Sequence, residues 1–121
     1  MTFSPDEPVV VMCLNQEIRT FVVGLTGAYV DPDLVLEGVR LELSEWTALC
    51  IQEHMEGGTL AAVEHLPAEL ADIYEFEMLN ESVRLAGSLR RAHGWYELTF
   101  LNPKMTVEYV GERRVVLPLK A

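Results

Sequence analysis

Basic residues and a tryptophan lie close together in a predicted β-hairpin in the second half of the chain. Segments 83–90 and 95–101 alternate apolar and polar side chains, and the four residues between them suit a hairpin loop. The polar face of this hairpin carries Arg84, Arg90 and Trp95, with Arg91 in the loop. Proteins hold single-stranded nucleic acid with such residues, because cations follow the phosphates and aromatic rings stack on the bases. The sequence therefore predicts a nucleic-acid-binding face here.

The predicted register pairs Arg90 with Trp95 and Arg84 with Leu101, and it leaves the opposite face apolar. The same residues permit a second interpretation. They fit an ordinary solvated sheet face, with a cross-strand cation–π pair and a salt bridge to Glu97.

Other residues with chemical potential form no catalytic signature. Cys50 and His54 are four residues apart in a predicted helix, a spacing compatible with metal ligation, but no second ligand pair supports a zinc site. The histidines His54, His65 and His93 fall on different predicted elements. We therefore predict no enzymatic activity, no catalytic residues, no cofactor and no metal site.

The charge is divided unevenly along the chain. Residues 1–80 hold 15 acidic and 2 basic side chains, giving −13, whereas residues 81–121 hold 4 acidic and 7 basic, giving +3. Either an acidic partner meets the C-terminal part, or the two halves pack together and neutralise each other. The net charge of −10 disfavours a duplex-DNA binder. It fits a regulator that binds a basic protein, such as a polymerase subunit in the transcription machinery, or an acidic surface that mimics nucleic acid.

Composition indicates one globular domain. The chain has 121 residues, of which 50% are hydrophobic, and it contains no apolar run of 18 residues, so we expect no membrane span. Its first residues lack the basic region of a signal peptide. Cys13 and Cys50 lie in apolar surroundings and are expected to be reduced. We therefore predict an intracellular protein of the cytoplasm or nucleus.

The elements that would position the site predict an α+β fold, a curved antiparallel sheet covered by one helix and followed by C-terminal hairpins. Ser44 is a suitable N-cap for the helix, and Gly57-Gly58 would end it. The predicted strands are 8–14, 18–25, 34–43, 74–79, 83–90, 95–101, 105–110 and 113–119, with turns at Asp31-Pro32-Asp33 and Gly111-Glu112. The predicted organisation is a disordered leader (1–7), a β-β-β-α unit (8–58), a helical connector (59–73) and a β-hairpin half (74–121) packed with the first as one domain.

Residues 38–49 read Gly-Val-Arg-Leu-Glu-Leu-Ser-Glu-Trp-Thr-Ala-Leu. This string, preceded by Tyr29-Val30-Asp31-Pro32, resembles the positive-cofactor-four family of single-stranded-DNA-binding transcriptional coactivators. In that family a strand ends with glycine, an aliphatic residue, any residue and leucine, and a tryptophan follows in the first turn of the helix. The resemblance covers about residues 9–56.

The resemblance implies a strand-strand-strand-helix fold, a homodimer and a non-enzymatic role in transcription. The family grips DNA with basic residues on its second and third strands, but the stretch 20–26 has none here. Arg40 and Tyr29 are the candidates that this part of the chain retains. The C-terminal half could replace the partner subunit, which would make the chain a single-chain pseudo-dimer.

Overall fold

The structure is a computed structural model that describes residues 3–5, 8–30, 34–91 and 94–114. Those residues form strands and turns and contain no helix, so the predicted α+β class is wrong and the described fold is all-β. The strands are β1 (Phe3–Ser4), β2 (Val9–Asn15), β3 (Thr20–Val30), β4 (Leu34–Ser44), β5 (Ala48–His54), β6 (Leu60–Val63), β7 (Glu75–Met78), β8 (Ser82–Ser88), β9 (Trp95–Leu101), β10 (Lys104–Glu108) and β11 (Gly111–Arg114).

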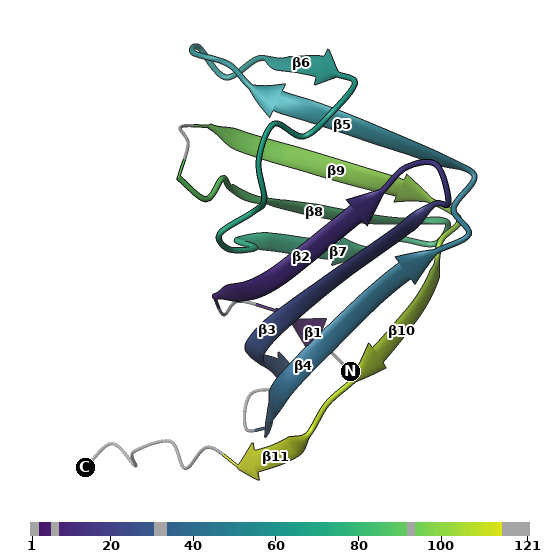
Figure 1. Cartoon of the computed structure of the whole chain (residues 1–121). Coiled ribbons are helices and arrows are strands. Elements are labelled where there is room, and N and C mark those ends of the chain that lie inside the picture. Colours follow the sequence, from purple (N-terminus) through teal and green to yellow (C-terminus); the bar gives the residue numbers. More distant parts are fainter. Residues whose placement is uncertain (1–2, 6–7, 31–33, 92–93, 115–121) are drawn as a thin grey trace.

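The strands build two antiparallel sheets (Figure 1). Sheet A contains β1 and β2 paired with β3, then β3 paired with β4, and β10 and β11 paired with β4. Sheet B has the order β6-β5-β9-β8-β7. The sheets do not follow the predicted halves of the chain, because sheet B is one continuous stretch and sheet A takes strands from both sides of it.

The predicted helix after Ser44 is wrong, because residues 48–54 form β5, which lies between β6 and β9 in sheet B. Leu49 and Ile51, two residues apart, pack into the core while Cys50 between them is exposed, which is the alternation of a strand. Pairing with β9 from Ala48 to Glu53 gives the backbone of β5 the hydrogen bonds that a helix would have made internally. The predicted helical connector is also wrong: it contains β6, and the rest of it is turns and an isolated bridge between Leu70 and Leu89.

The chain crosses between the sheets twice at one corner, from β4 to β5 and from β9 to β10 (Figure 1). The two crossings touch, since the Thr47 amide donates a hydrogen bond to the Leu101 carbonyl at 2.9 Å. Glu45 (φ 54°) and Asn102 (φ 50°) are left-handed, an uncommon conformation for residues other than glycine, and this lets each strand turn sharply. Trp46 lies in this corner.

The core lies between the sheets and is centred on three aromatic rings. Phe100 of β9 packs against Phe21 of β3, with ring centroids 5.3 Å apart, and against Trp46, at 4.8 Å. Trp46 is buried as predicted, although it covers the sheet from a corner and not from a helix. Such rings hide large apolar areas and hold the two sheets in register with each other.

Strands β10 and β11 form one long edge of sheet A, and the hairpin predicted at Gly111-Glu112 is wrong. Both strands pair with β4 in a single register, from Lys104 opposite Ser44 to Arg114 opposite Leu34. Gly38 of β4, at φ 61°, lies beside the join, where the Val110 amide bonds to the Glu37 carbonyl at 2.9 Å. A left-handed glycine lets β4 bend there without losing its partner.

The structure also tests the predicted register of the hairpin and the predicted disordered leader. In β8–β9, Ser88 lies opposite Trp95 and Arg84 opposite Thr99, so the predicted register is wrong by two residues. Because the side-chain period of a strand is also two, Arg84 and Trp95 still lie on the predicted polar face, but Arg90, predicted on the same face, reaches across to sheet A. Phe3 and Ser4 of the predicted leader pair with β3. The turn at 31–33, His93 and the predicted strand beyond residue 114 lie outside the described residues.

Candidate functional site

The outer face of sheet B holds a buried carboxylate. Glu97, in the middle of β9, is 7% exposed, although glutamate is rarely buried unless it is paired. The Arg84 Nε of β8 donates to its Oε1, and the His54 Nε2 of β5 lies 3.2 Å from its Oε2. The ion pair with Arg84 is the salt bridge of the second interpretation given above.

Two further carboxylates surround the same arginine. Arg84 Nη1 donates to Glu77 at 3.0 Å and Nη2 to Glu75 at 3.4 Å, both from β7. Burial lowers the pKa of Arg84, but the bonds and charges of Glu97 and then Glu75 outweigh burial and raise it above its ordinary value. We call Glu75, Glu77 and Glu97 the carboxylate cluster. Three acids around one cation leave this face negative.

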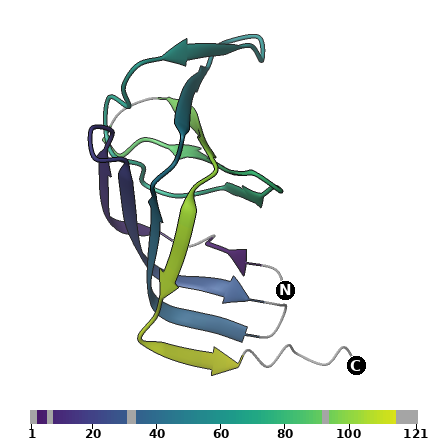
Figure 2. The same cartoon turned by 90° about the vertical axis from the view of Figure 1, so that its right-hand side faces the viewer.

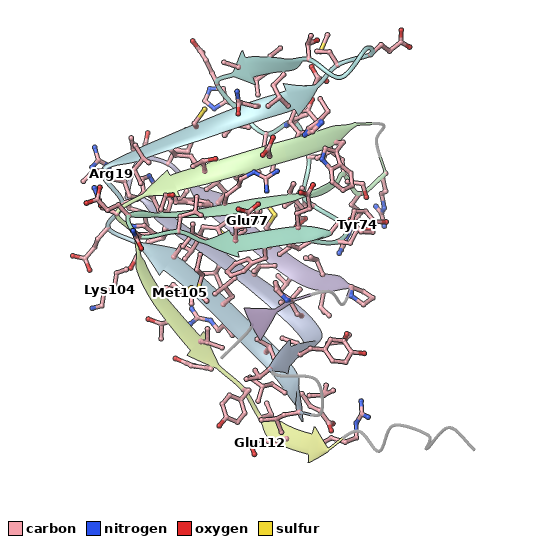
Figure 3. All side chains as sticks on the ribbon, turned by 180° about the vertical axis from the view of Figure 1, so that it is seen from behind. Arg19, Tyr74, Glu77, Lys104, Met105 and Glu112 are labelled. Carbon is pink, nitrogen blue, oxygen red and sulfur yellow. The ribbon has the colours of Figure 1, made fainter. Side chains whose placement is uncertain are left out.

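Two stacked aromatic rings, one of them exposed, lie next to the carboxylate cluster. Trp95 of β9 stacks on Tyr74, with ring centroids 5.0 Å apart and planes 8° from parallel, and His54 meets Trp95 edge-on at 5.9 Å. Tyr74 is 55% exposed, so much of this ring pair faces water. Figure 3, which views the molecule from behind, shows Tyr74 and Glu77 on the same side of sheet B. Aromatic faces beside carboxylates suit a cationic ligand, since both attract positive charge.

Arg90 and Arg91 do not join this face. The Arg90 guanidinium reaches across to sheet A and donates to the Val9 carbonyl, and its backbone amide donates to Glu69 at 2.7 Å. Arg91 is exposed at φ 59°, and with Arg90 it lines an open hollow of about 410 Å³ beside Glu69. Arg90 therefore ties the two sheets together and is not on a surface with Trp95.

Arg40 and Tyr29 lie on sheet A, away from the hairpin. Arg40 is placed between Glu42, at 3.7 Å, and Glu108, at 4.0 Å. Tyr29 is 40% exposed near the other end of β3, opposite Val35. The six predicted nucleic-acid-binding residues thus fall in separate places, and the structure brings Arg84 and Trp95 alone of them to one face.

The four-residue spacing of Cys50 and His54 suits metal ligation only if the two residues lie on a helix. On strand β5 their α-carbons are four residues apart, about 13 Å at the usual rise per residue. Within the described residues, no group of three or more His, Cys, Asp or Glu side chains is placed to hold a metal ion. The described part of the chain also contains no helix that could cross a membrane.

The sequence does not predict the acids Glu75 and Glu77 or the ring of Tyr74, which lie beside the hairpin. Glu75-Phe76-Glu77-Met78 alternates charged and apolar side chains, and this pattern could have placed both acids on the polar face beside Arg84. Tyr74 and His54 could not have been found in this way. They come from a segment next to β7 and from the segment predicted as a helix.

No family model, curated protein or solved structure matches this chain. Function is therefore inferred from the geometry and charge of the outer face of sheet B.

Proposed function

We propose that the protein is a non-enzymatic interaction module whose outer sheet B face binds a basic segment of a protein partner. The observation that carries this proposal is the setting of Arg84. Arg84, which the nucleic-acid hypothesis assigns to a phosphate, is surrounded by the carboxylates of Glu75, Glu77 and Glu97. A nucleic-acid phosphate would have to approach three carboxylates, whereas a lysine or arginine side chain would be attracted by them.

The ring pair strengthens the proposal for a peptide. A lysine or arginine laid on the exposed Tyr74, or on the partly buried Trp95, would gain a cation–π contact of about 0.5–1 kcal/mol and reach the carboxylates of β7. Glu75 and Glu77 have side chains about half exposed, so they can accept a second cation beside Arg84. The nucleic-acid hypothesis for the hairpin face places Arg84 on the phosphates, and the ion pairs of this residue do not favour that role.

The test is a titration of the protein into a labelled oligolysine peptide, followed by fluorescence anisotropy. We expect saturable binding that weakens with salt, and a three- to ten-fold loss in the Glu75→Gln/Glu77→Gln variant, since each exposed pair contributes about 0.2–1 kcal/mol. The matched control, Glu17→Gln/Glu56→Gln, removes the same charge from exposed turns elsewhere. A labelled single-stranded oligonucleotide is titrated in parallel at two salt concentrations. Oligonucleotide binding without peptide binding would overturn the proposal.

A further inference from the structure

Strand β10 leaves one side of its backbone unpaired. It pairs with β4 on one side, and no strand in the described part of the chain pairs with its other side. Figure 2 looks onto this edge and shows β10 in the foreground. An open strand edge is a ready template for another strand, and proteins that avoid pairing usually blunt such edges with charge, proline or a bulge.

The sequence of β10 is complementary to itself when it is turned through 180°. Lys104-Met105-Thr106-Val107-Glu108 can pair antiparallel with a second copy about a two-fold axis at Thr106. Each Lys104 then faces a Glu108 of the other copy, and each Met105 faces a Val107. Opposite charges and matched apolar side chains across a strand pair are both stabilising.

The charged pair is available for this contact. Within one copy, Lys104 lies 3.9 Å from Glu45, and Glu108 lies 4.0 Å from Arg40, both at the limit of an ion pair. Lys104 and Glu108 have side chains 70% and 66% exposed. Figure 3 shows Lys104 projecting from the edge of the sheet.

A groove beside β10 has both apolar and polar side chains in its lining, the polar ones being Asn80, Glu81, Ser82 and Asn102. Met105 lines a hollow of about 410 Å³ together with Met78, Leu79 and Val83, at the open end between the sheets. Met78 and Leu79 are each about half exposed. A second copy paired on β10 would place its Met105 and Val107 on the groove side, because directly opposite residues of paired strands share a face.

We infer that the chain forms a two-fold homodimer through antiparallel pairing of β10 with β10, which joins the two A sheets into one. This inference is independent of the peptide-binding face, which lies on sheet B. The contact is a short strand pair plus a groove, so we expect a dissociation constant in the micromolar range and not an obligate dimer.

Sedimentation equilibrium between about 1 and 100 µM tests the inference, using four proteins. We expect dimer formation by the parent, and a dissociation constant raised about ten-fold or more in Lys104→Glu, where like charges would meet twice. The double variant Lys104→Glu/Glu108→Lys exchanges the two charges and should restore the dimer. Arg113→Glu on β11, which makes the same change in net charge outside the pair, should dimerise like the parent.

A cross-link tests the position of the axis. Thr106→Cys, in a Cys13→Ser/Cys50→Ser background, should form an intermolecular disulfide on oxidation, because the axis places two copies of this residue about 4.5–5.5 Å apart. Glu112→Cys, away from the axis, should not. A parent that stays monomeric at 100 µM would overturn the inference and leave the edge to a strand from another protein. A dimer that the double charge exchange does not restore would also overturn it.

Discussion

Strands β7 and β10 are both edge strands with two charged side chains on one face, but their charges favour different partners. On β7 the alternate residues are Glu75 and Glu77, so a second copy turned about Phe76 would bring carboxylates face to face. On β10 the charged residues are Lys104 and Glu108, which attract each other when a second copy pairs in the same two-fold arrangement. One edge therefore opposes self-pairing and suits a basic strand, whereas the other suits a second copy of itself. The difference lies in the signs of the charges, which are alike on β7 and opposite on β10.

The largest expected effect is on the free energy of unfolding, and it differs between the arginine beside β7 and the arginine beside β10. Arg84→Ala should lower the free energy of unfolding by about 3 kcal/mol, because it leaves the buried Glu97 beside two other carboxylates without their cation. Arg40→Ala, beside β10, should cost no more than about 1 kcal/mol, since its pairs are exposed and long. Urea denaturation followed by circular dichroism measures both. Equal losses would contradict the distinction, and Arg84→Ala/Glu97→Gln should recover part of the first.

A single substitution should give β7 the pairing property of β10. Glu75→Lys places a cation two residues before Glu77, so that two copies turned about Phe76 form two Lys–Glu pairs in place of two repulsions. We expect a gain of about 2 kcal/mol in self-association. In the Lys104→Glu background, which blocks β10, sedimentation should show new dimers. A monomer there would mean that charge does not decide the behaviour of this edge.

Tyr74→Ala should have a smaller effect, confined to the β7 side. It removes the stacked partner of Trp95 and should lower the free energy of unfolding by about 1 kcal/mol. Binding of the oligolysine peptide should weaken, while the dimer of β10 should be unchanged in sedimentation. Tyr109→Ala, near β10, is the matched control, and a loss of peptide binding in this variant would contradict the assignment of the site.

The smallest expected effect is a loss of stability at alkaline pH. Burial raises the pKa of Tyr96, and its hydrogen bond to Glu53 and the charge of that group add to the shift. The folded state therefore prefers the neutral phenol, so this contribution is complete below the ordinary pKa of 10.0 and is lost as pH rises above it. Tyr96→Phe should flatten the fall in melting temperature above pH 10. A Tyr109→Phe variant should do so less, because Tyr109 is half exposed.

Local patterns predict most strands of this protein, because alternation and turn residues act over a few positions. They fail at residues 44–54, where Ser44 satisfies the local rule for a helix N-cap and Gly57-Gly58 satisfies the rule for a helix end. The deciding interaction is the pairing of β5 with β9, which is distant in sequence. Local patterns also predict a hairpin at Gly111, because glycine is common in tight turns. Here Gly111 instead lies in an extended edge strand that pairs with β4.

The candidate site is partly predictable for the same reason. Alternation correctly places Arg84, Trp95 and Glu97 on one outer face, even with the register wrong by two. It cannot tell which cation is free and which is neutralised, because the acids around Arg84 come from a neighbouring strand. It also cannot show that Arg90 reaches Val9 on the other sheet. Such contacts depend on how the sheets pack.

The long edge of sheet A has a consequence for how the chain folds during synthesis. Strands β2 to β4 leave the ribosome early, but β4 receives its second partner from residues 104–114, after all of sheet B has been made. Until then, the early strands expose an apolar face, and β4 lacks hydrogen-bond partners along one side. Such exposure favours binding by chaperones or misassembly. Folding dominated by such distant pairings is slow, on a scale of milliseconds to seconds. We expect sheet A to become protected from hydrogen exchange in one step, when its last strands arrive.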